Sequence, residues 1–190
     1  LENFGRADSF IDHGIGFGEA ASAPFRQFKA TLSEGGLTAA ALVRYPGVVP
    51  AGEVSDTFLT VMDILPTFLE IAGTEHPGAG EYRGRFIHGI LGRSFLSMLV
   101  DQTETVHPPT ESFGWYRGGR GGAVIRGDYK LINDIELGSE AGPGQAPAGA
   151  PWRLYNLATD RGETNDLALD LPDLTAELAA EWEAIWRGRE

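Results

Sequence analysis

Apolar residues recur at helical spacing in four stretches of the chain. One runs from Asp63, which can cap a helix, to Gly73, which can end it. A shorter one covers Ser94–Val100. A longer one follows Pro172 near the end of the chain. Its apolar stripe, which could cover one face of a sheet, consists of Leu174, Leu178, Trp182, Ile185 and Trp186.

The fourth stretch lies near the start of the chain. Ser22 can cap a helix that carries Phe25, Phe28 and Leu32 on one side, and the pair Gly35–Gly36 would end it. A helix of this length would stop just before the next apolar run.

Strand patterns occur in two parts of the chain. The run Thr38–Val43 is short and almost wholly apolar, as expected of a strand covered on both faces in a parallel sheet. From Ser112 onward, two β-prone runs are joined across Gly127-Asp128, which suits a tight antiparallel hairpin. The run WRLYNL, from Trp152 to Leu157, predicts a further strand. Between these runs, the stretch Leu137–Pro151 is rich in Gly, Pro and Ala and is predicted to form a surface loop.

This order of elements predicts an α/β fold in two parts. Residues 1–107 would form the last strands and helices of a larger α/β domain. Residues 108–190 would form a small antiparallel sheet packed by the C-terminal helix. If Thr38–Val43 normally lies inside a larger sheet, this chain alone exposes strand edges and apolar surface, so we expect it to self-associate.

Composition excludes several classes of function. The chain has 190 residues, no cysteine and a formal net charge of -12. An acidic chain of this kind lacks the basic face that nucleic-acid binding needs. It has no run of about 18 apolar residues that could span a membrane. Without cysteine it can form no disulfide, no thiolate metal site and no thiol nucleophile. We therefore expect a soluble globular protein with neither a nucleic-acid nor a membrane partner.

Lys29 is the main candidate for chemistry. It precedes an acid-Gly-Gly turn and the apolar run Thr38–Val43. Its compact positive charge suits an oxygen of a tetrahedral anion, and such a cation helps most where negative charge builds up in a transition state. A solvated lysine at a helix edge is the structural alternative.

Other polar groups have weaker functional patterns. The histidines, which lack metal-ligand spacing and are predicted to lie on the surface or in loops, are His13, His76, His88 and His107. The acids Asp160, Glu163 and Asp166 surround Arg161-Gly162, which favours turn and cap roles over metal binding. The glycines of YRGGRGGAV precede a strand and do not open a helix, so a phosphate loop is not indicated.

Several segments, in their order and spacing, resemble the sulfatase family, especially bacterial arylsulfatases of the alkaline-phosphatase-like superfamily. The segments, which cover most of the chain and match the C-terminal part of such enzymes, are KATLSEGG from Lys29, the strand ending RYPG at Gly47, VMDILPTFLEIAG ending at Gly73, AVIRGDYKLI ending at Ile132 and LYNLATDRGETNDLA ending at Ala168. The resemblance implies that Lys29 is the family's active-site lysine, which contacts the sulfate and is set in place by the turn Glu34-Gly35-Gly36.

The resemblance also implies what the full-length protein, the parent, would contain. Its nucleophile would be a formylglycine made from the first residue of a Cys/Ser-x-Pro-x-Arg motif, acting beside a calcium ion held by aspartates and an asparagine. Those segments fall before Leu1, and this chain alone is expected to hold neither group. Ser22 begins a Ser-x-Pro-x-Arg sequence, but its neighbours differ from the family motif, and we interpret it as a helix cap.

The predicted function of the parent is hydrolysis of sulfate esters, in the cytoplasm or periplasm of a bacterium if the resemblance holds. Because the catalytic groups act together, this chain alone is predicted to be inactive. Two alternatives stay open. One is a phosphodiester or phosphonate hydrolase of the same superfamily, since both anions are tetrahedral. The other is a non-catalytic module that binds a partner or carbohydrate through Trp115, Tyr116 and Arg117.

Overall fold

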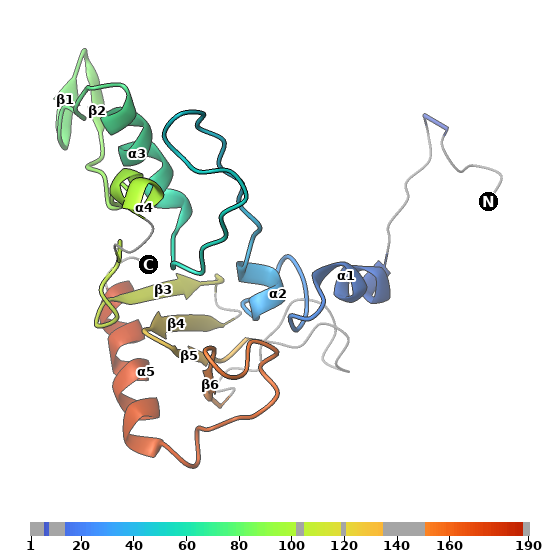
Figure 1. Cartoon of the computed structure of the whole chain (residues 1–190). Helices are drawn as coiled ribbons and strands as arrows, with labels where there is room; N and C mark the ends of the chain where they lie inside the picture. Colours follow the sequence, from blue (N-terminus) through green and yellow to red (C-terminus); the bar gives the residue numbers. More distant parts are fainter. Residues whose placement is uncertain (1–5, 8–13, 102–104, 119–120, 135–150, 188–190) are drawn as a thin grey trace. The chain divides into compact units, whose positions relative to one another are not determined.

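A computed structural model of the chain describes residues 6–7, 14–101, 105–118, 121–134 and 151–187 (Figure 1). The chain divides into two compact units. Unit 1 contains residues 1–40 and 110–190, and unit 2 contains residues 41–109. The first 40 residues thus group with the C-terminal sheet. The domain boundary between residues 107 and 108 stays a prediction about the parent.

A four-stranded antiparallel sheet is the centre of unit 1. Its strands, in spatial order, are β3 (Ser112–Tyr116), β4 (Gly122–Arg126), β5 (Tyr129–Ile132) and β6 (Arg153–Asn156). Arg126 is paired with Tyr129, so Gly127 and Asp128 form the predicted two-residue connection. Gly127 has a φ of 56°, which a side chain would disfavour. The predicted hairpin and the predicted strand in WRLYNL are both confirmed.

The sheet of unit 1 is covered on both faces. Successive strand residues point to opposite faces, so alternate residues enter different clusters. On one face, helix α5 (Pro172–Trp186) packs on the sheet, as Figure 1 shows. The helix-side cluster consists of Val124, Leu131, Leu154 and Leu178. On the other face, the loop-side cluster consists of Leu32, Ala123, Ile132 and Tyr155. The predicted covering role of the C-terminal helix is confirmed.

The helix predicted from Ser22 is wrong. Helix α1 (Gly14–Ser22) ends where that helix was expected to begin, and the short helix α2 (Glu34–Leu37) contains the glycine pair expected to end it. Between them, Gln27 and Ala30 have φ values of 62° and 72°, in the left-handed region. A right-handed helix cannot pass through two such residues. Phe28 and Leu32 therefore belong to a folded loop, and Ser22 is no N-cap.

Unit 2 is built from short elements. They are the 3-10 turn η1 (Val61–Asp63) and the helices α3 (Ile64–Ile71) and α4 (Leu96–Asp101), with a two-stranded hairpin of β1 (Gly80–Tyr82) and β2 (Arg85–Ile87). The helices predicted over Asp63–Gly73 and Ser94–Val100 are confirmed within two residues at each end. The β1–β2 hairpin was not predicted, because its strands are too short to show an alternating pattern.

The strand predicted over Thr38–Val43 is wrong for this chain. These residues are exposed, Leu42 completely, and no strand among the described residues pairs with them. A strand needs hydrogen-bonding partners along its backbone, and the described strands are all paired elsewhere. The apolar sequence is thus present without the sheet that it was expected to join. The predicted loop Leu137–Pro151 falls almost wholly outside the described residues.

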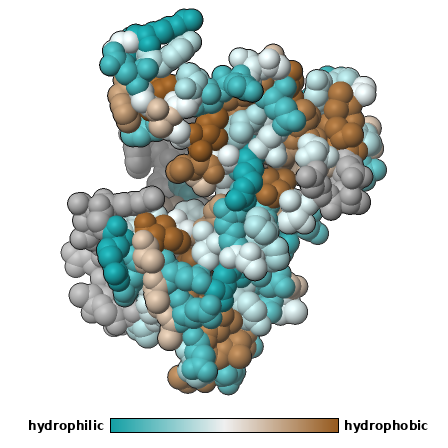
Figure 2. All heavy atoms as spheres, turned by 90° about the vertical axis from the view of Figure 1, so that its left-hand side faces the viewer, coloured by the Kyte–Doolittle hydropathy of each residue, from teal (hydrophilic) through white to brown (hydrophobic). Residues whose placement is uncertain are grey.

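Much apolar surface is visible on the molecule in Figure 2. The exposed apolar side chains of unit 2 include a set from η1 and α3 that are each at least 39% exposed: Val61, Met62, Ile64, Leu65, Phe68 and Ile71. We call this set the α3 face. The core of unit 2 is small and consists of Phe95, Met98 and Leu99. Within the described part of the chain, no helix has both the length and the apolar character needed to cross a membrane.

Candidate functional site

Lys29 lies in an exposed turn of unit 1. The turn is closed by Thr31, whose backbone N–H and side-chain hydroxyl both donate to the carbonyl of Phe28, at 3.3 and 2.8 Å. Ala30, directly after the lysine, has a φ of 72°. No hydrogen bond or ion pair joins the Lys29 ammonium to another described residue. The lysine is therefore presented at the tip of a defined turn with its charge accessible.

The two glycines that follow Lys29 close the surrounding loop, which we call the lysine loop (Arg26–Leu37). The backbone N–H of Gly35 donates to the carbonyl of Arg26 at 2.9 Å. A Cβ at Gly35 would lie 2.6 Å from that same carbonyl oxygen, and a Cβ at Gly36 would lie 2.5 Å from Oγ1 of Thr31. Real Cβ atoms do not approach oxygen so closely. The acid-Gly-Gly sequence is needed because the loop backbone folds back against both glycines.

Leu32 anchors the lysine loop on the sheet. Its side chain is part of the loop-side cluster, and its backbone N–H donates to Oδ2 of Asp134 at 2.5 Å. Asp134 is itself held by Arg117, whose Nη1 lies 2.9 Å from Oδ1, while Arg153 donates to the Asp134 carbonyl at 3.3 Å. The carboxylate of Asp134 thus ties the loop to the end of β5 and to Arg117, and its backbone carbonyl adds a contact with Arg153.

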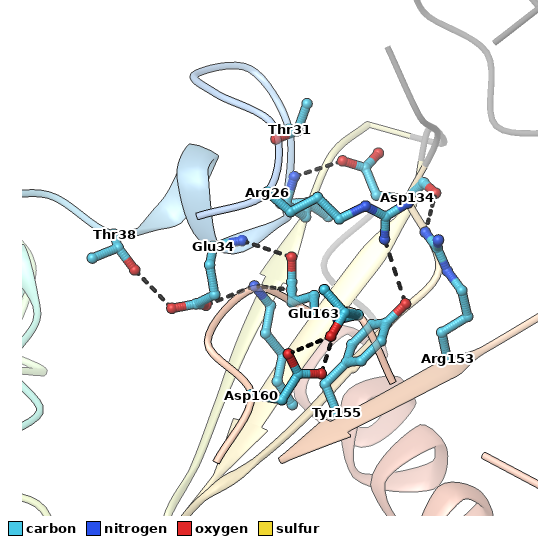
Figure 3. A network of polar contacts seen from close by, with 12 residues as sticks. Arg26, Thr31, Glu34, Thr38, Asp134, Arg153, Tyr155, Asp160 and Glu163 are labelled. Atoms are coloured by element: carbon cyan, nitrogen blue, oxygen red, sulfur yellow. Dashed lines mark hydrogen bonds and ion pairs between the residues drawn. The ribbon is translucent and has the colours of Figure 1, made fainter. Parts of the chain in front are cut away.

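A second contact joins the start of the loop to β6. Arg26 donates to the hydroxyl of Tyr155 at 3.4 Å (Figure 3). Burial raises the pKa of the Tyr155 phenol, although the positive charges of Arg153 and Arg26 oppose this. The phenol is therefore neutral near pH 7 and accepts from the guanidinium as an uncharged oxygen.

Beneath the loop lies an ion cluster that we call the buried triad (Glu34, Lys130 and Glu163). The Lys130 ammonium lies 2.8 Å from Oε1 of Glu34 and 2.9 Å from Oε1 of Glu163. The first contact is an aligned hydrogen bond, and the second has the geometry of an ion pair only. Lys130 is 0% exposed, and the two glutamates are 7% and 3% exposed. Figure 3 shows Glu34 and Glu163 facing each other beneath the loop.

The remaining carboxylate oxygens of the triad also have partners. Oε2 of Glu34 accepts from the Thr38 hydroxyl at 2.8 Å, and Oε2 of Glu163 accepts the backbone N–H of Glu34 at 3.0 Å. Glu163 comes from the turn after β6, where it has a φ of 53°. The triad therefore connects the lysine loop, β5 and this turn.

The acidic residues around Arg161 serve the turn, as predicted. Asp160 accepts from the backbone N–H of Thr164 at 2.8 Å and from that of Asn165 at 2.9 Å. Desolvation acts to raise the pKa of Asp160, but these hydrogen bonds together outweigh it and hold the pKa below its ordinary value. Asp166 accepts the backbone N–H of Leu154 at 3.0 Å. Asp166 thus joins the turn to β6. Glu163 departs from the prediction, because it is buried and joins the turn to Lys130 and Glu34.

His107 lies in a loop, which is one of the two predicted positions, but it is buried and not on the surface. In unit 2 its Nε2 lies 2.9 Å from Oδ2 of the fully buried Asp63, and its Nδ1 lies 2.9 Å from Nη1 of Arg93. Burial acts to raise the pKa of Asp63, but hydrogen bonds from Arg93, His107 and Thr60 outweigh it and lower the pKa. The contact between His107 and Asp63 could not be predicted because they are 44 positions apart.

The buried ion pair between Lys130 and Glu34 was also not predicted from the sequence. One available signal was the position of Lys130 in the hairpin. It alternates with Ile132 on the same face of β5, so a charged residue occupies an inward-facing position. Such a lysine requires an acidic partner, and the sequence does not say which of many acids provides it.

The remaining candidate residues either pack within the fold or fall outside the described residues. Trp115 is partly buried against the loop-side cluster, and its carbonyl accepts from Trp182 Nε1 at 2.8 Å. The glycine-rich run after Tyr116 includes residues 119–120, which the structure does not describe. Within the described ranges, no group of three or more His, Asp or Glu side chains is arranged to hold a metal ion. These residues therefore do not fit the calcium site that the family resemblance implies for the parent.

Comparison with known proteins decides the family. No protein-family model matches the chain. Over 182 residues, or 96% of its length, the chain is 37% identical to an uncharacterized sulfatase of Schizosaccharomyces pombe. The chain belongs to the sulfatase family. The N-acetylgalactosamine-6-sulfatase of Sus scrofa is a further relative, 34% identical over 158 residues that cover 74% of the chain.

This sulfatase chain spans only about a third of its relatives. The matched region is 31% of the S. pombe protein and 28% of the S. scrofa protein, and it corresponds to a C-terminal portion of a sulfatase. Among solved structures, Ps i-CgsB has a TM-score of 0.60 at 21% identity, covering 85% of this chain and 32% of that one. A protein in complex with its substrate D-glucosamine-2-N,6-O-disulfate has a TM-score of 0.51 at 24% identity, covering 76% of this chain and 27% of that one. These likenesses concern the fold, and the predicted α/β fold class is confirmed.

Proposed function

We propose that this chain supplies the sulfate-contacting lysine, Lys29, to a sulfatase that hydrolyses sulfate esters, as of aryl or similar alcohols. The observation that carries the proposal is the presentation of Lys29: an exposed ammonium at the tip of a loop whose backbone is fixed on a buried sheet. A cation held in this way needs little reorganisation when an anion binds, which is the condition for effective electrostatic stabilisation.

The chemistry assigned to Lys29 is binding and charge neutralisation. Its ammonium would donate to a sulfate oxygen and stabilise the negative charge that grows as the ester bond breaks. The overall charge of -12 makes such a local cation necessary, because the chain as a whole repels anions. The formylglycine and calcium of sulfatases are proposed for the parent only.

The test is replacement of Lys29 in the parent. We expect Lys29→Ala to lower kcat/KM for an aryl sulfate by about 100-fold to 1,000-fold, the size of effect seen when one transition-state donor is removed. Arg187→Ala, which removes an exposed cation at the end of α5, is the matched control and should leave kcat/KM unchanged. Unchanged turnover by Lys29→Ala would refute the proposal. Parallel assays with a phosphodiester and a phosphonate ester define the preferred anion.

The isolated chain is proposed to be inactive. It presents Lys29, but in the family the attacking group comes from a segment that this chain does not match. Aryl sulfate turnover by the purified 190-residue chain, above the level of its Lys29→Ala variant, would contradict this.

A further inference from the structure

The chain contains two lysines, and the structure places them in opposite environments within one assembly. Lys29 is exposed at the tip of the lysine loop, whereas Lys130 is 0% exposed beneath it. The proposed function uses Lys29 only. Burying an ammonium is unfavourable unless it is paired, so the position of Lys130 requires an explanation.

Lys130 has two carboxylates as partners, and the three groups differ in their freedom to move. Lys130 is fixed by the ladder of β5, which pairs with both β4 and β6. Glu163 is fixed in a turn next to β6 that Asp160 stabilises. Glu34 belongs to the lysine loop, which has no strand pairing. The loop is therefore the part that can leave the sheet if the triad is broken.

The charges of the triad explain why it would hold the loop closed. Two carboxylates share one buried ammonium, and both of them lose water on burial. Without the ammonium, the carboxylates of Glu34 and Glu163 would face each other at low dielectric, which is strongly unfavourable. Opening the loop relieves this, because it returns Glu34 to water. Lys29 lies five positions before Glu34 and would move with it.

We propose that Lys130 is a positioning residue for Lys29: through Glu34, its buried ammonium holds the lysine loop against the sheet. The catalytic consequence of this role rests on the proposed function, but the structural consequence does not. The small C-terminal sheet is then more than a cap on a larger domain, because one of its faces carries the platform on which the functional lysine is held.

A lysine-specific endoprotease tests the proposal in the chain itself. In Lys130→Met, Lys29 is the remaining lysine, so cleavage reports opening of its loop alone. The control is Leu178→Ala, which weakens the opposite face of the same sheet without touching the loop. Under native conditions we expect cleavage after Lys29 to be faster in Lys130→Met than in the control by about tenfold or more, as a 1.4 kcal/mol shift in the opening equilibrium gives.

A second variant covers the case in which Lys130→Met does not fold. Glu34→Gln keeps the shape of the side chain and leaves Lys130 and Glu163 as a neutral pair. We expect this variant to unfold at the wild-type temperature while its Lys29 is cleaved several-fold faster, about threefold to tenfold. With isotope-labelled lysine, the Lys29 resonance should move toward its position in an unfolded peptide, and the Lys130 resonance should not. The proposal would be overturned if, across these variants and the control, the rate of cleavage after Lys29 and the position of its resonance changed only in proportion to the loss of global stability.

Activity of the parent separates this inference from the proposed function. If both hold, Glu34→Gln lowers kcat more than it changes KM, and has no further effect in a Lys29→Ala background. If Lys29→Ala leaves turnover unchanged while the protease and resonance changes occur, the proposed function fails and the positioning role stands. If Lys29→Ala lowers turnover but changes in the triad do not alter loop opening, the proposed function stands and the positioning role fails.

Discussion

The two compact units of this sulfatase chain bury their apolar residues to very different degrees. In unit 1, both faces of one sheet are covered, and six side chains of its two clusters are 0% exposed. In unit 2, the three residues of the core cluster are each 3–9% exposed, and most of the apolar side of α3 faces water. The difference shows which part of the chain closes its own core and which part presents surface suited to further polypeptide.

The two units also differ in how their buried charged groups connect the chain. Unit 1 uses buried charges to join segments far apart in sequence: Lys130 and Glu34 are separated by 96 positions. In unit 2, Asp63 bonds to Thr60, three positions away, and to Arg93 and His107. Unit 1 therefore depends on long-range ion pairs to fix a loop, and unit 2 on one carboxylate that joins short elements.

The largest expected effect follows from the difference in burial. Leu154→Ala empties a fully buried site in the helix-side cluster and should lower the free energy of unfolding of unit 1 by about 2–5 kcal/mol. Leu65→Ala, on the exposed α3 face, should change stability by less than about 0.5 kcal/mol. The four tryptophans all lie in unit 1, so their fluorescence during urea unfolding measures the first effect. Equal losses in the two variants would break the comparison.

The next effect concerns the lysine loop. A methyl group at Gly36 would meet the backbone and hydroxyl of Thr31, so Gly36→Ala should destabilise unit 1 by about 1–3 kcal/mol. The control is Gly16→Ala in α1, where a Cβ meets no atom within 4 Å. That change should be neutral or stabilising by about 0.5–1 kcal/mol, because alanine favours a helix interior. Thermal unfolding of the two variants checks the sign of each change, and a neutral Gly36→Ala would show that the loop backbone is not tightly packed there.

A smaller, pH-dependent effect is expected in unit 2. Because the pKa of Asp63 is lowered by folding, its contribution to stability is complete above its unfolded pKa of about 3.9 and is lost as pH falls through the folded pKa. Asp63→Asn should therefore destabilise unit 2 by about 1–3 kcal/mol at neutral pH. It should also reduce the loss of stability in acid. Hydrogen exchange of the α3 amides from about pH 3 to 7 measures both effects.

Glu75→Gln, in an exposed part of the same unit, is the control for this pH profile. It should leave the profile of the α3 amides unchanged. If Asp63→Asn and Glu75→Gln give the same profile, the buried carboxylate is not the group that titrates.

Local signals in the sequence account for the elements that were predicted well. Gly127-Asp128 specifies a hairpin through two adjacent residues, and Asp63 and Gly73 lie beside the two ends of α3. The Asp63 side chain makes no cap hydrogen bond, however, because its carboxylate contacts Thr60, Arg93 and His107. The lysine loop could not be predicted in this way. Its shape depends on left-handed conformations at Gln27 and Ala30 that glycine would be expected to provide. It also depends on the approach of backbone atoms that lie several positions apart.

The candidate site divides in the same way. Lys29 could be proposed from the sequence because an acid-Gly-Gly turn begins five positions after it, and its contact with sulfate stays a prediction. Lys130 could not, because its role depends on Glu34 and Glu163, which come from distant segments. The apolar run Thr38–Val43 is the converse case: its composition predicted a strand, but pairing requires a neighbour that the described residues do not provide.

The smallest expected effect on stability is that of a substitution on the α3 face. Such a substitution should weaken self-association of the chain and leave its stability almost unchanged. An exposed apolar set of this kind favours contact with another surface, and for the chain alone we expect a second copy to provide it. Phe68→Ser removes a side chain that is 64% exposed and should weaken self-association about tenfold, as the loss of one interfacial aromatic allows. Leu169→Ser, which removes a 95% exposed side chain in unit 1, should have no effect. Light scattering across a concentration series measures both, and a wild-type chain that stays monomeric throughout would contradict the assignment of this face.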